Sequence, residues 1–196
     1  MRKSMLALLF VSSATALAVI ACNNGQDNAE KGSLSSDSTA LVKRGAYLVN
    51  SIGCDDCHSP RRMGPKGPEI IPELRFSGYP SSRPVQNAET SVLKNGWVLF
   101  GPDLTSSVGP WGMSFSANIT SDATGIGDWK EDQFINAIRH GKYKGLDTGR
   151  DLLPPMPWMT YKNMTDDDLK AIFAYLKSTN PVKNVVPAPI PLDQVK

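Results

Sequence analysis

Cys54, Cys57 and His58 lie within five consecutive residues, Cys54-Asp55-Asp56-Cys57-His58. Two cysteines at this spacing, with a histidine directly after the second, are the pattern by which a c-type haem is attached. Each thiol can form a thioether with one haem vinyl group, and the imidazole that follows can bind the iron. We therefore expect Cys54 and Cys57 to hold one haem c covalently, and His58 to be its proximal axial ligand.

Two other kinds of site share part of this pattern, namely half of a zinc site and a thioredoxin-like thiol pair. A zinc ion needs about four ligands, and outside the motif only Cys22 and His140 remain to supply sulfur or nitrogen. A thioredoxin-like pair expects strands that alternate with helices, and the chain lacks that pattern. The sequence therefore favours haem attachment over both.

The overall charge balance of the 196-residue chain does not indicate a binding surface for nucleic acid, although local charged patches remain possible. There are 21 basic and 19 acidic side chains, and without Arg2 and Lys3 each sign numbers 19. Proteins that bind polyanions carry a clear excess of basic residues, so we expect no nucleic-acid partner. The length allows one domain and a tail.

The amino terminus has the features of a secretory signal peptide over residues 1–21. Arg2 and Lys3 precede an apolar run that ends in small residues, which is typical of export signals. Val19-Ile20-Ala21-Cys22 resembles a bacterial lipobox, in which the cysteine becomes the lipidated first residue. The alternative is an ordinary cleavage site beside a free cysteine. We expect an exported lipoprotein, anchored to a membrane through Cys22 and facing the bacterial periplasm.

Residues 22–38 follow as a polar stretch with one large apolar residue, Leu34. Such a composition buries too little apolar surface to offset the entropy of ordering. We expect a flexible tether between the lipid and a folded domain.

Three helices are predicted in the folded part, which makes the fold mainly α. The first covers residues 39–50 and contains Gly45, whose cost of about 1 kcal/mol makes sense if another helix crosses there. The second runs from Trp129 to Arg139, opened by Asp128 and Glu131 and ended by Gly141. The last begins after a Thr165 cap, and its apolar face consists of Leu169, Ile172, Phe173 and Leu176.

Residues 59–117 are rich in proline and glycine and lack a helical pattern. We expect turns and short extended pieces, including a hairpin around Lys94-Asn95-Gly96. A stretch this long without regular structure usually has a function, and here we expect it to cover a haem edge.

The order of first helix, haem motif, proline-flanked methionine and capped last helix resembles the class I cytochrome c domain, over residues 39–187. Residues 188–196 are then a C-terminal tail, and residues 59–117 a long proline/glycine-rich insertion between the haem motif and the axial-methionine segment. Gly109–Thr120, Thr124–Trp129 and Pro155–Trp158 resemble one branch in particular, the cytochromes associated with membrane-bound dehydrogenases of alcohols and sugar acids. Those subunits typically carry three haem motifs, whereas this chain has one, which favours a stand-alone carrier.

The resemblance implies a methionine as the sixth iron ligand. Met156 lies between Pro155 and Pro157 and matches the Met-Pro element of the family. Methionine sulfur raises the potential of the iron relative to a second histidine. The other candidates are Met159, Met164, Met63, Met113 and His140, the last at a helix end where a histidine usually faces solvent.

Other parts of the haem surroundings stay open at this point. The family resemblance implies that a Gly-Pro loop accepts a hydrogen bond from the proximal histidine, and either Gly67-Pro68 or Gly101-Pro102 could serve. Candidates for the haem wall are Trp111, Phe115, Trp129, Trp158 and Tyr161.

The pattern as a whole favours a membrane-tethered monohaem c-type cytochrome that acts in electron transfer and is not an enzyme. The alternatives are a haem enzyme of peroxidase type and an electron-accepting subunit of a dehydrogenase complex. Its partners would be redox proteins, with a donor dehydrogenase or respiratory complex on one side and an acceptor oxidase or another cytochrome on the other. A filled axial position leaves peroxide no place to bind, so Met156 favours the carrier.

Overall fold

The computed structural model describes the backbone of residues 26–196 and the side chains of residues 37–196. Two compact units divide the chain between Thr39 and Ala40, and residues 40–196 form the larger one. The predicted signal peptide and Cys22 lie outside the described residues. Within the described part, no helix is long and apolar enough to cross a membrane.

Helix α1, Gln26–Ser51, begins at Gln26 rather than at Thr39. Residues 26–38, which belong to the predicted flexible tether, are therefore helical. This stretch contains no proline, and extending an existing helix requires much less free energy than starting one. The division of the chain into anchor, linker, domain and tail stays a prediction.

Helix α5, Asp166–Lys177, packs against α1 at Gly45, as predicted. A Cβ atom at Gly45 would lie 1.9 Å from the carbonyl oxygen of Ala171, so only glycine permits this approach. The Thr165 side chain accepts a hydrogen bond from the backbone N–H of Asp168 and caps α5, which confirms the predicted cap. The predicted apolar face is buried, with Leu169, Ile172, Phe173 and Leu176 all under a tenth exposed.

Helix α3, Glu131–His140, begins two residues later than predicted, and Asp128 is not its cap. The N–H of Trp129 donates to the carbonyl of Ile126, so this residue belongs to a turn before the helix. Gly141 ends α3 with a φ of 64°, as predicted. The short helix α4, Trp158–Tyr161, follows a loop that contains the 3-10 turn η3, Tyr143–Gly145. Both α4 and α5 contact α3.

The core lies where α1, α3 and α5 meet. Phe134 of α3 packs against Phe173 of α5, with 5.3 Å between the centroids of the tilted rings. Two residues from outside the helices complete it, Phe76 and Ile126. The buried cluster consists of Leu48, Val49, Phe76, Ile126, Phe134, Leu169, Ala171, Ile172, Phe173 and Leu176.

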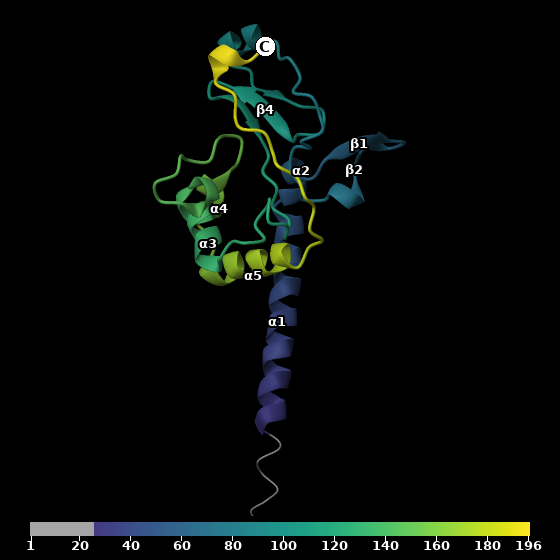
Figure 1. Cartoon of the computed structure of the whole chain (residues 1–196), viewed down its shortest axis with the longest axis vertical. Helices are drawn as coiled ribbons and strands as arrows, with labels where there is room; N and C mark the ends of the chain where they lie inside the picture. Colours follow the sequence, from purple (N-terminus) through teal and green to yellow (C-terminus); the bar gives the residue numbers. More distant parts are fainter. Residues whose placement is uncertain (1–25) are drawn as a thin grey trace, which may run out of the picture. The chain divides into compact units, whose positions relative to one another are not determined.

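Residues 59–117 form two small antiparallel sheets (Figure 1). The first is a hairpin of β1, Arg61–Gly64, and β2, Gly67–Ile70. The second contains β3, Leu99–Phe100, β4, Ser106–Gly109, and β5, Gly112–Phe115, in that order. The 3-10 helices η1, Pro72–Leu74, and η2, Thr90–Asn95, connect them.

The predicted hairpin around Asn95-Gly96 is wrong. Residues 90–95 form η2, whose first turn is capped by the Glu89 side chain, and Gly96 ends it with a φ of 82°. Glycine at positive φ is as suited to ending a helix as to forming a tight hairpin. β3 pairs instead with β4.

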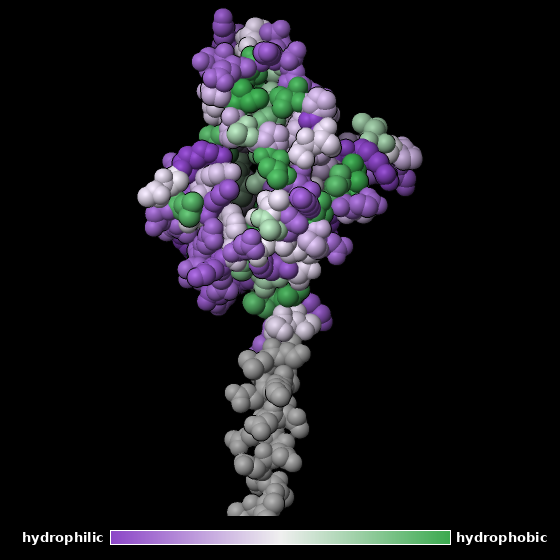
Figure 2. Space-filling model, viewed as in Figure 1, coloured by the Kyte–Doolittle hydropathy of each residue, from purple (hydrophilic) through white to green (hydrophobic). Residues whose placement is uncertain are grey.

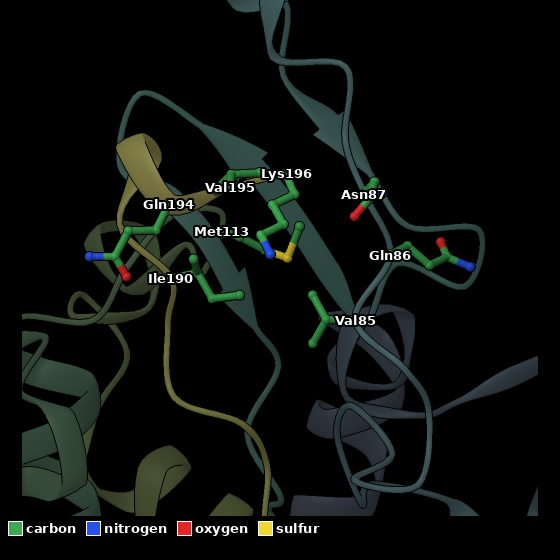
Figure 3. A pocket seen from close by; sticks show the side chains of 8 residues that line it. All are labelled: Val85, Gln86, Asn87, Met113, Ile190, Gln194, Val195 and Lys196. Atoms are coloured by element: carbon green, nitrogen blue, oxygen red, sulfur yellow. The ribbon is translucent and has the colours of Figure 1, made fainter.

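In the chain after α5 (Figure 1, yellow), Asn184 bonds the carbonyl of Ser77, in the segment between the two sheets. Ile190 exchanges two backbone hydrogen bonds with Met113 of β5, at 2.8 and 2.9 Å, and η4, Leu192–Gln194, follows. A pocket of about 220 Å³ lies between this segment and residues 85–87. Figure 3 shows the Met113 side chain at this pocket, beside Ile190 and Val85.

Candidate haem-binding site

Helix α2, Cys54–His58, carries the three residues that the sequence predicts to hold haem. Gly53, with a φ of 77°, turns the chain from α1 into α2, and the extended Ser59 leads it out. Residues three apart lie on the same side of a helix. Cys54 and Cys57 are therefore on one side of α2, and His58 is its last residue.

A network around Asp55 fixes α2 in place. The Arg75 guanidinium donates to both carboxylate oxygens of Asp55, with distances between 2.5 and 3.2 Å. Ser59 Oγ donates to Asp55 at 2.6 Å and accepts from the N–H of Phe76 at 2.9 Å. Because Phe76 is a core residue, the network ties the haem motif to the core.

His58 Nδ1 lies 2.8 Å from the carbonyl oxygen of Ala117. A carbonyl can only accept, so Nδ1 carries the proton and Nε2 is the ring nitrogen with a free lone pair. Burial lowers the pKa of His58, although the Ala117 carbonyl and Asp55 act in the opposite direction. A neutral imidazole with a fixed Nδ1 proton is the form that binds a metal through Nε2.

The two Gly-Pro candidates for this hydrogen bond are both wrong. The acceptor belongs to Ala117, and Gly67-Pro68 is instead the start of β2. Ala117 contacts His58 only through its backbone carbonyl, which every residue type has. The sequence therefore gives no sign that this residue orients the histidine.

The pKa values of the two thiols are shifted in the opposite direction from those of a redox-active pair. Burial, followed by the charge of Asp55, raises the pKa of Cys54 to about 12. Burial and Asp56 also raise the pKa of Cys57. Thiol-disulfide exchange requires a thiolate, which enzymes favour by lowering the cysteine pKa. These residues are therefore poorly suited to thioredoxin-like chemistry.

Met156 is half-buried in the proline-flanked segment. The carbonyl of Pro154, two residues earlier, accepts a hydrogen bond of 2.7 Å from Ser114 Oγ of β5. After the methionine, Tyr161 of α4 donates from its hydroxyl to the carbonyl of Ile52 at 3.0 Å. Burial and the nearby Cys54 and Cys57 raise the pKa of Tyr161. The Met156 segment is thus fixed at both ends, and one of these contacts is beside the haem motif.

The other methionines and His140 have different surroundings. Met63 and Met159 are 79% and 66% exposed. Met113 is buried in β5, and Met164 packs against the core. His140 is exposed at the end of α3, which confirms that it faces solvent.

The proposed wall aromatics have varied contacts. Trp111 donates to Ser114 Oγ at 3.2 Å, Phe115 packs edge-on against Tyr79, and Trp129 packs against the core. Trp158 lies against Gly141, where a Cβ would be 2.4 Å from its ring. Tyr161 donates to the carbonyl of Ile52, two residues before Cys54. Figure 2 shows a hollow in the surface between the α3–α4 region and the part of the chain around α2.

Several residues of the site carried no recognisable pattern in the sequence. Arg75 and Ser59 hold Asp55, and Ala117 orients His58. Arg75 and Ala117 come from within residues 59–117, where no helical period fixes a position. Gly78 lies against the Ala117 peptide, and the sequence does not show this either, because a glycine in a loop has many possible roles.

The residues present fit a covalently bound haem c. Two thiols lie on one side of a short helix, and the imidazole beside them is oriented through Nδ1 so that Nε2 can reach iron. This arrangement defines a c-type haem site. The C-x-x-C-H pattern occurs once in the sequence.

The Cytochrome c family model matches residues 42–180, and the chain belongs to this family. The family is one of haem electron carriers rather than of enzymes that transform a substrate. Membership therefore gives the chain the class I cytochrome c fold and a covalently attached haem c.

Similar proteins bear the names of dehydrogenase subunits. The chain is 34% identical over 137 residues to the gluconate 2-dehydrogenase cytochrome c subunit of Pantoea cypripedii, covering 69% of this chain and 22% of that one. It is 42% identical over 138 residues to the alcohol dehydrogenase (quinone) cytochrome c subunit of Gluconacetobacter polyoxogenes, covering 70% and 21%. It is 29% identical over 136 residues to the fructose dehydrogenase cytochrome subunit of Gluconobacter japonicus, covering 69% and 20%. The chain thus spans about a fifth of the length of these relatives.

Proposed function

We propose that this protein is a membrane-tethered monohaem cytochrome that transfers electrons, with Cys54 and Cys57 as the thioether residues and His58 and Met156 as the axial ligands. The observation that carries the proposal is the hydrogen bond from His58 Nδ1 to Ala117, directly beside the paired cysteines. It gives the imidazole the tautomer that binds iron. When bound, the haem supplies an iron that exchanges one electron between its ferrous and ferric states.

The residues of the chain would orient the group and keep the iron six-coordinate. Asp55 and Arg75 hold α2, and Ala117 holds the His58 ring. Pro155 and Pro157 restrict the backbone around Met156, so that presenting its sulfur costs little conformational entropy. The segment 59–117 would act as an insertion that covers a haem edge.

A dehydrogenase is the partner class that the relatives support. Three relatives are named as cytochrome subunits of gluconate, alcohol and fructose dehydrogenases. We propose that this chain accepts electrons from a dehydrogenase and passes them to an oxidase or another cytochrome. Export, and lipidation at Cys22, would place it at a membrane surface facing the periplasm.

Optical spectra of the holoprotein test the axial ligands. Met156→Ala should remove the weak far-red methionine-to-iron band of the ferric protein and lower the potential, while covalent haem remains. Carbon monoxide or peroxide should then bind, and peroxidase activity should rise.

Met159→Ala is the matched control, since Met159 is exposed. It should leave the spectrum unchanged. If the Met159 variant loses the band and the Met156 variant keeps it, Met156 is not the sixth ligand. A high-spin parent spectrum would favour the peroxidase alternative.

A further inference from the structure

Two backbone segments hold His58 between them. The carbonyl of Ala117 accepts from His58 Nδ1 at 2.8 Å. The carbonyl of His58 itself accepts from the N–H of Gly78, also at 2.8 Å. The orientation of the imidazole therefore depends on residues 76–79 and 116–119 together.

These two segments are bonded to each other. Tyr79 N–H donates to Ser116, and Ile119 N–H donates to Phe76, at 3.0 and 2.9 Å. Between these bonds, Gly78 lies against the Ala117 peptide. A Cβ at Gly78 would be 2.5 Å from the Ala117 carbonyl carbon and 2.6 Å from its oxygen. The position of the Ala117 carbonyl, which accepts the hydrogen bond from His58, thus depends on how closely Gly78 approaches the Ala117 peptide.

Asn184, in the chain after α5, fixes the Gly78 segment. Its side chain is buried, at 7% exposed. Nδ2 donates to the carbonyls of Ser77 and Tyr79, at 2.7 and 2.9 Å, on the two sides of Gly78. Oδ1 accepts from the N–H of Ser81 at 2.8 Å. One amide therefore determines the path of five consecutive residues.

The same part of the tail holds the acceptor segment. Asn118, directly after Ala117, donates from Nδ2 to the carbonyls of Val182 and Asn184 at 2.8 and 3.3 Å. Thr124 Oγ1 accepts from the N–H of Asn184 at 2.9 Å. Residues 182–184 are thus bonded to both segments that contact His58.

The geometry points to Asn184 as a positioning residue for His58. By fixing residues 77–81 against Ala117, Asn184 sets the length of the hydrogen bond on His58 Nδ1, and through it the reduction potential. This inference rests on the proposed role of His58 as an axial ligand. A stronger Nδ1 hydrogen bond raises the basicity of the imidazole, which favours ferric over ferrous iron. Loosening the segment should therefore raise the potential.

The test is Asn184→Leu, which keeps the side-chain size and removes all three hydrogen bonds. In the ferrous holoprotein, the His58 Nδ1 proton followed by NMR should exchange with solvent about tenfold faster, as expected for a weakened buried hydrogen bond. The reduction potential should shift to more positive values. The haem should remain attached.

Asn136→Leu is the matched control. Asn136 Nδ2 also bonds loop groups, the Gly145 carbonyl and Asp147, but neither of these bonds His58 or its two segments. It should lower stability without changing the Nδ1 exchange or the potential. If the Asn184 variant is destabilised yet matches the control in both readouts, Asn184 is only structural.

A measurement on the parent covers the case in which Asn184→Leu fails to fold. The Ser81 amide, bonded to Asn184, and the His58 Nδ1 proton should become exchangeable in the same opening event as denaturant is added. If Ser81 exchanges while the His58 proton stays protected by a further tenfold or so, the coupling is absent. A parent without a histidine–methionine spectrum would instead overturn the proposed axial ligands, which keeps the two failures distinguishable.

Discussion

Asp55 occupies a variable position of the haem motif, and its carboxylate depends on a single arginine for charge compensation. The Asp55 side chain is 14% exposed and that of Arg75 36% exposed. Arg75→Gln would leave a largely buried carboxylate with only Ser59 as a strong partner. We expect a loss of about 1–3 kcal/mol in unfolding free energy, below the range for fully buried pairs because Arg75 is partly solvated. Urea unfolding of the holoprotein measures this.

Arg44→Gln is the control, because it removes an ion pair whose arginine is exposed to solvent. Arg44 bonds Asp168 at 3.0 Å, but its side chain is 53% exposed. Exposed ion pairs contribute under about 1 kcal/mol. Equal losses for the two variants would show that the Asp55 network has no special weight.

Asp103 gives the protein a predictable response to acid. Its burial tends to raise the pKa, but hydrogen bonds from Arg83 and Thr105 outweigh this and lower the pKa from 3.8. The pKa of Asp103 is lower in the folded state than in the unfolded chain. Its stabilisation is therefore fully present above the unfolded-state pKa and is lost as the pH falls through the folded-state pKa. Below about pH 4, the melting temperature of the parent should therefore fall more steeply than that of Asp103→Asn. Parallel pH curves for the two proteins would contradict this.

At the scale of elements, the contact between α1 and α5 determines whether the core closes. In Gly45→Ala, the added methyl would overlap the Ala171 carbonyl, from which it would be 1.9 Å away. Since α1 leads directly into α2, separating the helices also disturbs the haem motif. We expect a loss of about 3 kcal/mol or more, because backbone atoms cannot move aside as a side chain can. Thermal unfolding of the holoprotein measures it.

Gly96→Ala separates steric overlap from backbone conformation. Nothing lies within 4 Å of a Cβ at Gly96, but its φ is positive. Its cost should be about 1–2 kcal/mol, from the left-handed conformation alone. If Gly45→Ala lowers the unfolding free energy by no more than Gly96→Ala does, α1 and α5 can move apart at little cost.

The elements that could be predicted from the sequence are those whose determinants are local. The cap, acidic first turn and apolar period of α5 lie within its own residues, and its start and buried face agree with the prediction. The sheets of residues 59–117 depend on pairing between segments, such as Val108 with Met113, and their residues have no strong alternation. Asn95-Gly96 was misassigned because a positive φ at glycine serves helix ends and hairpins equally.

At the scale of the whole molecule, the predictable part of the site is the contiguous haem motif. The parts that orient it come from distant segments and act largely through the backbone. Ala117 offers a carbonyl, and Gly78 offers the absence of a side chain. Asn184 is far along the chain, after the last helix. No residue type marks such contacts, because the fold alone brings them together.

Cys22 is the residue through which we expect the whole protein to be held at a membrane. It follows Val19-Ile20-Ala21, and the folded unit of residues 40–196 uses only Cys54 and Cys57. Two acyl signals give stable anchoring, whereas none leaves the protein free in solution. Cys22→Ser should therefore move the protein from the membrane fraction to the soluble fraction, while its haem spectrum and potential stay those of the parent. Intact-mass analysis of membrane-extracted parent protein should give the mass of a chain that begins at Cys22 and carries acyl chains. An unmodified cysteine there, or a Cys22→Ser protein that stays with the membrane, would rule out lipid anchoring at this residue.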